Sequence, residues 1–395
     1  MSRRFYIVAG AAGFAFANMA LSVPLHVVAT GAKAAVAGDV LAVSTLVIAL
    51  SALSAGVVGA RVGGGPRLLG VAVAIMGLGS TTLAFASGLA LLAVGAAVVG
   101  AGLGMFWVAS QLILSRRSGE PDSGHGFLSH YAIYTLGGLV GSGLTGAFAG
   151  GARSLGFAEV TGLRASSALA IGVIVVALVV WRRCAVVSPV AAKPLPAAPS
   201  RGLSVQVPDL LLVAALALLL PLAPVVLARN FGLAPFAIGL VTAGVAGSKI
   251  AGTVAARLIA RGSGPRRTIL LLLGGGAGFC VVLCAALSLS VFVTALFATA
   301  LATTGAWPLV VDAAQARVDP ASRRSLTVRW NAREYALIAA TTLVSGWLLT
   351  TLGSAVPLFA LAAFLFACSA ASAAILLRRP VWRTDAAPSY MPSGT

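Results

Sequence analysis

Charged side chains are scarce in this sequence, and acidic ones are the scarcest. Only 9% of the 395 residues are charged, with nine Asp and Glu against 27 Lys and Arg. Soluble domains carry about 25% charged residues. Hydrophobic residues make up 59% of the chain. This composition excludes an ordinary soluble domain and indicates a polytopic membrane protein.

Several patterns that enzymes and cofactor-binding proteins use are also missing. The four cysteines show no metal or redox spacing, and packing inside an apolar run explains Cys280 and Cys284. The three histidines lack the spacing of a metal site, and no Gly-x-x-x-x-Gly-Lys-Ser/Thr phosphate loop occurs. Of the acidic residues, only Asp312 and Glu334 are expected to approach the membrane interior. We therefore predict no enzymatic activity, no metal site and no cofactor.

Basic residues give the chain a net charge of +18, which in a soluble protein would suggest nucleic-acid binding. Here they form no continuous stripe and fall between apolar blocks, so we expect no nucleic-acid partner. If the N-terminus is cytoplasmic, 21 Lys and Arg residues fall on the inner side of the membrane and four on the outer side. This asymmetry follows the positive-inside rule, places both termini in the cytoplasm and leaves only Lys249 and Arg333 inside spans.

Twelve apolar runs of about 20 residues are long enough to cross a bilayer. Helices are expected because backbone polar groups in lipid must be satisfied within one segment, and the runs lack the alternation of a β-barrel. The first run is longer than the apolar region of a secretory signal, so we expect it to be retained. Pro221 and Pro224 are expected to bend span seven. The expected spans are 5–29, 38–60, 68–87, 89–114, 127–150, 164–181, 208–228, 237–260, 268–289, 291–316, 327–351 and 355–377.

The two halves of the sequence share landmarks. The segment GVVGAR at 56–61, followed by Gly-Pro-Arg at 65–67, returns as GTVAAR at 252–257, followed by Gly-Pro-Arg at 264–266. Trp107 and Trp307 are 200 residues apart, as are Gly146 and Gly346. An internal duplication is the simplest explanation. The expected organisation is an N-terminal six-helix bundle over 1–181, a cytoplasmic linker over 182–207, a C-terminal six-helix bundle over 208–379 and a cytoplasmic tail over 380–395.

This organisation resembles the major facilitator superfamily. Twelve spans in two sets of six, a central linker and a Gly-x-x-x-x-Arg-x-Gly run between spans two and three carry the resemblance. It implies an all-α membrane protein with two pseudo-symmetric six-helix bundles, monomeric and located in the cytoplasmic (inner) membrane. It further implies a secondary transporter that binds a small-molecule substrate between the bundles and works by alternating access.

In that family the run after span two contributes to an inner gate. Here its glycines and arginines are present, but Ala60 stands where the family has an acid, and Ala256 repeats the loss in the second half. Gating is therefore expected to depend on the arginines and on glycine-permitted packing. Span four also lacks the arginine, and span five the proline, that proton-coupled drug exporters of the family often carry. The predicted gate residues are Gly56, Arg61, Gly63, Arg67, Gly252, Arg257 and Asp312.

Charge inside the spans is the strongest functional signal, because Lys or Arg at a helix centre costs about 2.5–3.5 kcal/mol on insertion scales. Lys249 in span eight and Glu334 in span eleven are expected at similar depths. We predict that they pair at the cavity, and that Glu334 titrates or exchanges Lys249 for a substrate group during transport. The alternative is a static ion pair that fixes helix packing.

Other polar and aromatic residues are expected to line the same cavity. Trp107 and Trp307 lie too deep for the lipid interface, although packing between the halves would explain them equally well. Arg333 would line the cavity or pair with Asp312. Asn18 would line it or bond to a neighbouring helix. The predicted cavity residues are Asn18, Trp107, Gln111, Tyr131, Tyr134, Lys249, Trp307, Asn331, Arg333 and Glu334.

The preferred function is proton-coupled efflux of a small organic molecule, with protons, the substrate and the lipid bilayer as partners. Protons are favoured because the cavity offers one carboxylate and no acidic cluster suited to sodium. Two alternatives stay open. Uptake or exchange of an organic anion is suggested by the two predicted cavity cations, Lys249 and Arg333, which outnumber the one predicted cavity carboxylate, Glu334. A non-transporting receptor or scaffold is suggested by the missing acids at Ala60 and Ala256.

Overall fold

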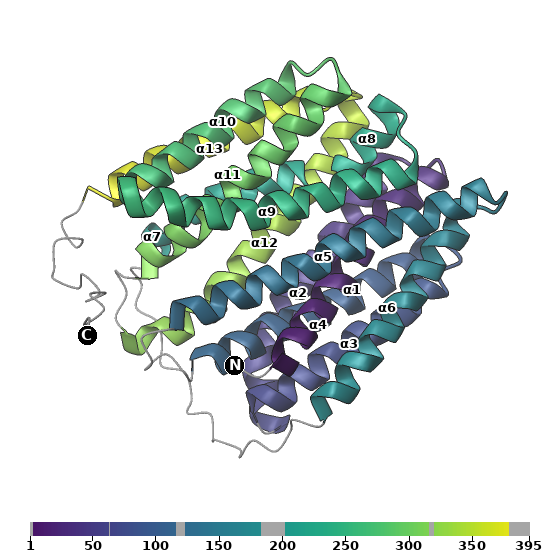
Figure 1. The fold of residues 1–395 in the computed structure, drawn as a ribbon, viewed down its shortest axis with the longest axis horizontal. Helices are drawn as coiled ribbons and strands as arrows, with labels where there is room; N and C mark the ends of the chain where they lie inside the picture. The colour runs from purple at the N-terminus through teal and green to yellow at the C-terminus, as the bar shows by residue number, and fades with distance from the viewer. Residues whose placement is uncertain (1–2, 63, 116–122, 183–201, 316–319, 379–395) are drawn as a thin grey trace, which may run out of the picture.

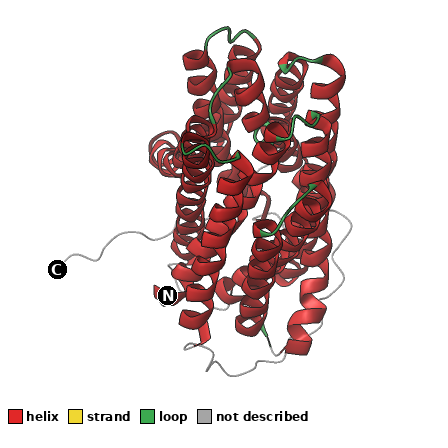
Figure 2. Ribbon diagram, turned by 90° about the vertical axis from the view of Figure 1, so that its right-hand side faces the viewer, coloured by secondary structure: helices red, strands yellow, loops and turns green. Residues whose placement is uncertain are grey.

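The computed structural model describes residues 3–62, 64–115, 123–182, 202–315 and 320–378. Over these ranges the regular structure is entirely α-helical, with short turns between the helices (Figure 2). The thirteen helices of the described chain are α1 (Arg3–Ala29), α2 (Ala34–Val62), α3 (Gly65–Ala84), α4 (Leu89–Ser115), α5 (Ser123–Ser154), α6 (Glu159–Arg182), α7 (Gly202–Leu219), α8 (Ala223–Phe231), α9 (Pro235–Ser263), α10 (Pro265–Cys284), α11 (Leu289–Gln315), α12 (Pro320–Leu352) and α13 (Val356–Leu376).

Within the described residues, twelve helical segments are long and apolar enough to cross a membrane, with α7 and α8 together forming one of them. The chain is therefore a multi-pass membrane protein, and the prediction of twelve helical spans is confirmed. Several helices extend beyond the predicted limits. For example, α2 begins at Ala34 rather than at 38, and α9 at Pro235 rather than at 237.

Span seven is interrupted where the two prolines were expected to bend it. Helix α7 ends at Leu219 and α8 begins at Ala223, with Pro221 in the turn between them and Pro224 in the first turn of α8. Proline has no backbone N–H and cannot continue an α-helix hydrogen-bond ladder in its interior, but it is well suited to a first turn. The break lies beside the cavity that is described below.

The repeated Gly-Pro-Arg segments start two equivalent helices. Gly64 (φ 105°) precedes α3 and Gly264 (φ 78°) precedes α10, and each helix carries a proline in its first turn. A positive φ suits glycine, and proline fixes the φ of a first helical residue. The repeated residues therefore have the same structural role at both places, which is to begin a helix.

The helices gather in two groups, α1–α6 and α7–α13 (Figure 1). In the first group, α3 packs against α4 and α6, and α1 against α5 and α6. In the second, α10 packs against α11 and α13, and α7 against α12 and α13. Buried apolar residues form one large core cluster in each group. The most extensive contacts between the groups join α2 to α12 and α5 to α9.

Glycines allow the closest approach between the two groups. A Cβ added to Gly346 would lie 2.9 Å from the Cα of Gly38, and one added to Gly146 would lie 2.6 Å from the Cα of Gly239. We call the end of the bundle where α1 begins the N-terminal end, and the opposite end the far end. Both glycine contacts lie toward the far end. Any side chain at these positions would force the helix backbones apart.

Candidate functional site

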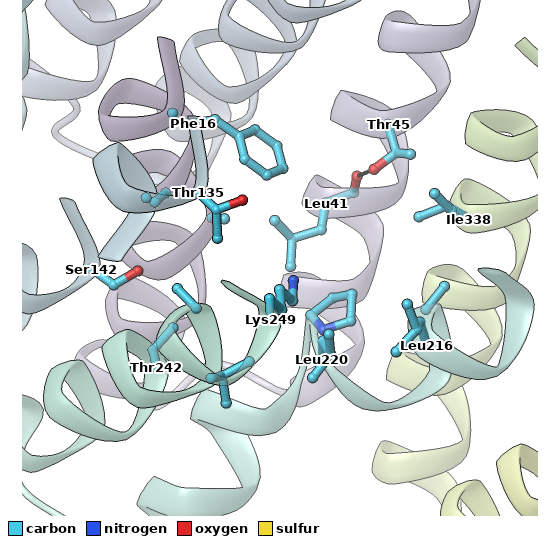
Figure 3. A pocket seen from close by; sticks show the side chains of 18 of the residues that line it. Phe16, Leu41, Thr45, Thr135, Ser142, Leu216, Leu220, Thr242, Lys249 and Ile338 are labelled. Atoms are coloured by element: carbon cyan, nitrogen blue, oxygen red, sulfur yellow. Dashed lines mark hydrogen bonds between the residues drawn. The ribbon is translucent and has the colours of Figure 1, made fainter. Parts of the chain in front are cut away.

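A cavity of about 410 Å³ lies between the two helix groups (Figure 3). Its lining comes from α1, α2, α4 and α5 on one side and from α7, α8, α9, α11 and α12 on the other. Most of the lining is apolar, with a few polar groups. This volume and this lining are typical of a small-molecule site.

Eight of the ten predicted cavity residues line it, although their distances along the chain are large. They come from α4, α5, α9, α11 and α12. They are Trp107, Gln111, Tyr131, Tyr134, Lys249, Trp307, Asn331 and Glu334.

Two contacts join the groups at the N-terminal end of the cavity. The amide Nδ2 of Asn331 on α12 donates to Oε1 of Gln111 on α4 at 3.1 Å. The rings of Tyr131 on α5 and Trp307 on α11 have centroids 5.8 Å apart. The cavity therefore lies between this layer of contacts and the glycine contacts at the far end.

Aromatic rings form a continuous wall at this end of the cavity. Trp107 contacts Tyr134 at a centroid distance of 4.9 Å and Tyr131 at 6.5 Å, and Tyr131 continues to Trp307 in the other group. Flat apolar faces with a few polar edges suit a ligand that is itself flat and largely apolar.

Lys249 is the cation of the cavity. Figure 3 shows its side chain directed into the space between the helices. Among the residues that the structure describes, its ammonium group forms no ion pair or hydrogen bond. The predicted pair with Glu334 is therefore wrong for this structure. The reason is the helix arrangement, because α9 packs against α5 and α11 whereas α12 packs against α2 and α7.

Glu334 instead faces the contact between α12, α7 and α11. It is 7% exposed, and its polar neighbours are the side chains of Asp209, Trp330 and Trp307. Trp330 Nε1 donates to Oδ2 of Asp209, which is fully buried on α7. The expectation that only Asp312 and Glu334 approach the membrane interior is also wrong. Sequence reasoning placed Asp209 at the edge of span seven, but that span begins at Val205 and encloses it.

Asn18 does not line the cavity. It is fully buried in the first group, where its Nδ2 donates to Thr145 Oγ1 and to Ser166 Oγ at 2.8 Å each. Its Oδ1 accepts from Ser167 Oγ at 3.0 Å. Asn18 thus joins α1 to α5 and α6, which corresponds to the alternative prediction of a bond to neighbouring helices. A buried amide is stable when its hydrogen-bonding groups are satisfied.

Arg333 points away from the cavity. It is exposed, and its guanidinium donates to Oε1 of Gln206 at 2.9 Å. The predicted partner Asp312 instead lies within electrostatic range of Arg257 on α9. The 100° rotation between successive helical residues separates Arg333 from Glu334 and explains why only one of them reaches the cavity.

The structure places most of the predicted gate residues, and their role as a gate stays a prediction. Arg61 and Arg67 are exposed, and an added Cβ at Gly56 would meet open space. Gly63 lies outside the described residues. An added Cβ at Gly252 would lie 2.1 Å from the carbonyl oxygen of Leu301, so this glycine serves the packing of α9 on α11.

Ala256 stands at the second position where the family that the sequence resembles has an acid, and its packing explains a small residue there. Ala256 is 2% exposed, and its Cβ would lie 3.2 Å from a Cβ added to Gly305 on α11. A carboxylate at this position would be buried against a helix backbone, where an unpaired charge is costly. The loss of the acid therefore fits the close approach of α9 and α11.

The burial of His130 is expected to lower the stability of the protein. Its ring is fully buried and stacks on Phe5 (4.6 Å between centroids) and Phe106 (5.6 Å), and within the described chain neither ring nitrogen has a hydrogen-bond partner. We expect His130→Phe to raise stability by about 1–3 kcal/mol, because it removes unsatisfied polar atoms and keeps the stacked ring. Thermal unfolding in detergent measures this. His130→Ala should lower the melting temperature, and a lower melting temperature for His130→Phe would contradict the prediction.

Comparisons of this chain with protein-family models and with curated proteins found no match. Function must therefore be argued from the cavity and its residues. The decisive features are a largely apolar space between two helix groups, a cation that has no anionic partner among the described residues, and a buried carboxyl in the cavity wall.

Proposed function

We propose that this protein is a secondary transporter that moves a small organic molecule across the cytoplasmic membrane by alternating access. The observation that carries the proposal is the cavity that both helix groups line. Substrate sites of secondary transporters lie at such an interface, near the bilayer midplane. The protein would work as a monomer of two pseudo-symmetric six-helix bundles with both termini in the cytoplasm, as in the major facilitator superfamily that the sequence resembles.

The far-end contacts support the pseudo-symmetry. Gly146 and Gly346 are 200 residues apart, and their partners Gly239 and Gly38 are 201 apart. The duplication offset therefore relates the contact of α5 with α9 to the contact of α12 with α2. Equivalent glycines at both contacts give a hinge surface on which the bundles would rock.

Two layers of contacts would alternate during transport. The glycine contacts join the groups at the far end, and the Gln111–Asn331 hydrogen bond and the Tyr131–Trp307 contact join them at the N-terminal end. Opening one layer while the other holds would expose the cavity to one side of the membrane at a time. The thin N-terminal layer consists of side chains that can separate without disrupting a helix.

Proton-coupled efflux is the preferred mode because Glu334 offers a buried carboxyl at the cavity. Transport would be tested in liposomes with an imposed pH gradient and a panel of small lipophilic molecules. We expect Glu334→Gln to reduce gradient-driven accumulation by about tenfold or more, a coupling of at least about 1.4 kcal/mol.

The control variant is Glu159→Gln, which breaks a surface ion pair with Arg153 (3.0 Å) and should transport normally. Unchanged transport by Glu334→Gln would argue against proton coupling at this residue. Absence of any flux across the panel would instead favour a non-transporting receptor or scaffold.

Exchange or uptake of an organic anion is a second candidate, and a specific observation favours it. Lys249 presents a cation to an apolar cavity with no anionic partner among the described residues. A buried cation without a partner is costly, and a substrate anion would relieve that cost. Exchange of labelled anions without proton movement would support this mode over the first.

A further inference from the structure

Two carboxyl groups meet in the wall of the cavity where α7 packs against α12. Asp209 is fully buried on α7, and Trp330 of α12 donates its indole N–H to Asp209 Oδ2. Glu334 follows Trp330 by one helical turn, so it faces the same way, and Asp209 is its neighbour across the contact of α12 with α7. Glu334 also lines the cavity. The pair thus joins a buried site to the transport pathway.

Neither carboxyl has a cationic partner in the part of the chain that the structure describes. Arg333 donates to Gln206, and Lys249 on α9 forms no ion pair with any described residue. Asp209 Oδ1 is buried and accepts no hydrogen bond from any described donor. An ionised carboxylate requires donors for its oxygens, and burial without them is costly. The missing donor is supplied if the neighbouring carboxyl carries a proton.

The helices around the pair bring no other compensating charge. From α13, Ser369 donates its hydroxyl to the carbonyl oxygen of Pro208 at 2.6 Å, and from α11, Trp307 reaches Glu334. The other titratable or charged side chains described on α2, α7, α11, α12 and α13 make no ion pair with either carboxyl; they are Asp39, Arg61, Asp312, Arg329, Tyr335 and Cys368.

We propose that Asp209 and Glu334 share one proton and together form the proton-carrying site of the transporter. Two carboxylates at hydrogen-bonding distance repel each other, so a buried pair is stable with one proton between its oxygens. The inference rests on the proposed proton-coupled transport and adds Asp209 as the second member of the site. It also explains why Glu334 has no need of Lys249 in this structure.

The site gives a physical link between proton release and helix movement. When the shared O–H bond breaks, the proton leaves through Glu334 to water in the cavity, and two carboxylates remain. Their repulsion acts directly across the contact of α7 with α12. Because α12 also packs on α2 of the other group, a shift of α12 would reach the contact between the bundles. Protonation from the opposite side would restore the pair.

Infrared spectroscopy of the purified full-length protein, in H₂O and D₂O at neutral pH, tests the shared proton without a substrate. We expect a carbonyl band of a protonated carboxyl that shifts in D₂O. Asp209→Asn and Glu334→Gln should each shift or remove that band, whereas Glu159→Gln should leave it unchanged. The conservative Asp209→Glu, which keeps two carboxyls, should retain a protonated-carboxyl band. Size-exclusion profiles and melting temperatures would show that each variant is folded.

Two results would overturn the inference. One is a wild-type protein without such a band, and the other is a band that Asp209→Asn leaves unchanged. Failure of the proposed function would look different. The band could be present in the wild type and absent from both variants while the wild type moves no protons with any substrate. That result would support the shared proton and refute proton-coupled transport. Proton-coupled transport with a band that is insensitive to Asp209→Asn would refute only the pair.

Discussion

Gly346→Trp is expected to reduce transport by about 100-fold, because the indole holds the two helix groups apart at the far end. The conformation that is open at that end would be favoured by about 2.7 kcal/mol or more. Even a Cβ at this position would lie 2.9 Å from the Cα of Gly38 and 3.2 Å from the carbonyl oxygen of Ala34. An indole cannot be accommodated without separating α2 from α12. The variant should fold, since the contact lies between the two core clusters and not within one.

Cysteine labelling would show whether a change of conformation causes the loss of transport. Thr45 lines the cavity, and in the proposed orientation the far end faces outside. A Thr45→Cys protein should react with an impermeant maleimide added outside faster in the Gly346→Trp background, with the native cysteines as the measured background. Gly274→Trp is the matched control, because that glycine of α10 has open space around it. Wild-type transport by Gly346→Trp, or equal impairment by Gly274→Trp, would refute the prediction.

Lys249→Met should reduce exchange of aromatic carboxylates such as salicylate by about 100-fold, since removing one member of a desolvated charge pair costs about 2–5 kcal/mol. The ammonium group is the cation directed into the cavity, and the aromatic wall of Trp107, Tyr131 and Trp307 would hold the ring of the substrate. Flux of neutral substrates should change much less. Counterflow of labelled salicylate in liposomes measures both effects.

Two controls accompany this variant. Lys249→Arg keeps the charge and should retain much of the exchange, and Lys33→Met removes an exposed lysine and should have no effect. The melting temperature of Lys249→Met should be equal to or above that of the wild type, because a cation without a partner has been removed. Equal salicylate exchange by Lys249→Met and wild type would exclude an anion-binding role.

The sequence predicted which residues line the cavity better than it predicted which residues contact each other. Lys249 and Glu334 stood out because charge is expensive in lipid, and both line the cavity. Their pairing was wrong because it depended on the neighbours of α9 and α12. Asp209 was missed because span seven was predicted to begin at 208, which placed this carboxyl at the end of the span, whereas the helical segment begins at Val205.

Asn18 and Arg333 illustrate the same limit. Each is a polar residue at a depth compatible with the cavity, and each is directed elsewhere. Asn18 bonds to Thr145, Ser166 and Ser167, and Arg333 bonds to Gln206. The rotation of a helix about its axis decides between cavity, lipid and a neighbouring helix. In membranes that rotation is set by packing and interhelical hydrogen bonds rather than by an amphipathic pattern.

The sequence by itself determined the number and helical form of the spans, because the length of an apolar run and the need to satisfy backbone groups in lipid are local properties. It also predicted a bend of span seven at Pro221 and Pro224, since proline acts on its own helix, and the structure has a break between helices there. Only the tertiary structure decided that Glu334 meets Asp209 and that Lys249 faces the cavity without an anionic partner in the described chain. Those outcomes depend on contacts between helices far apart in sequence, which no local pattern encodes.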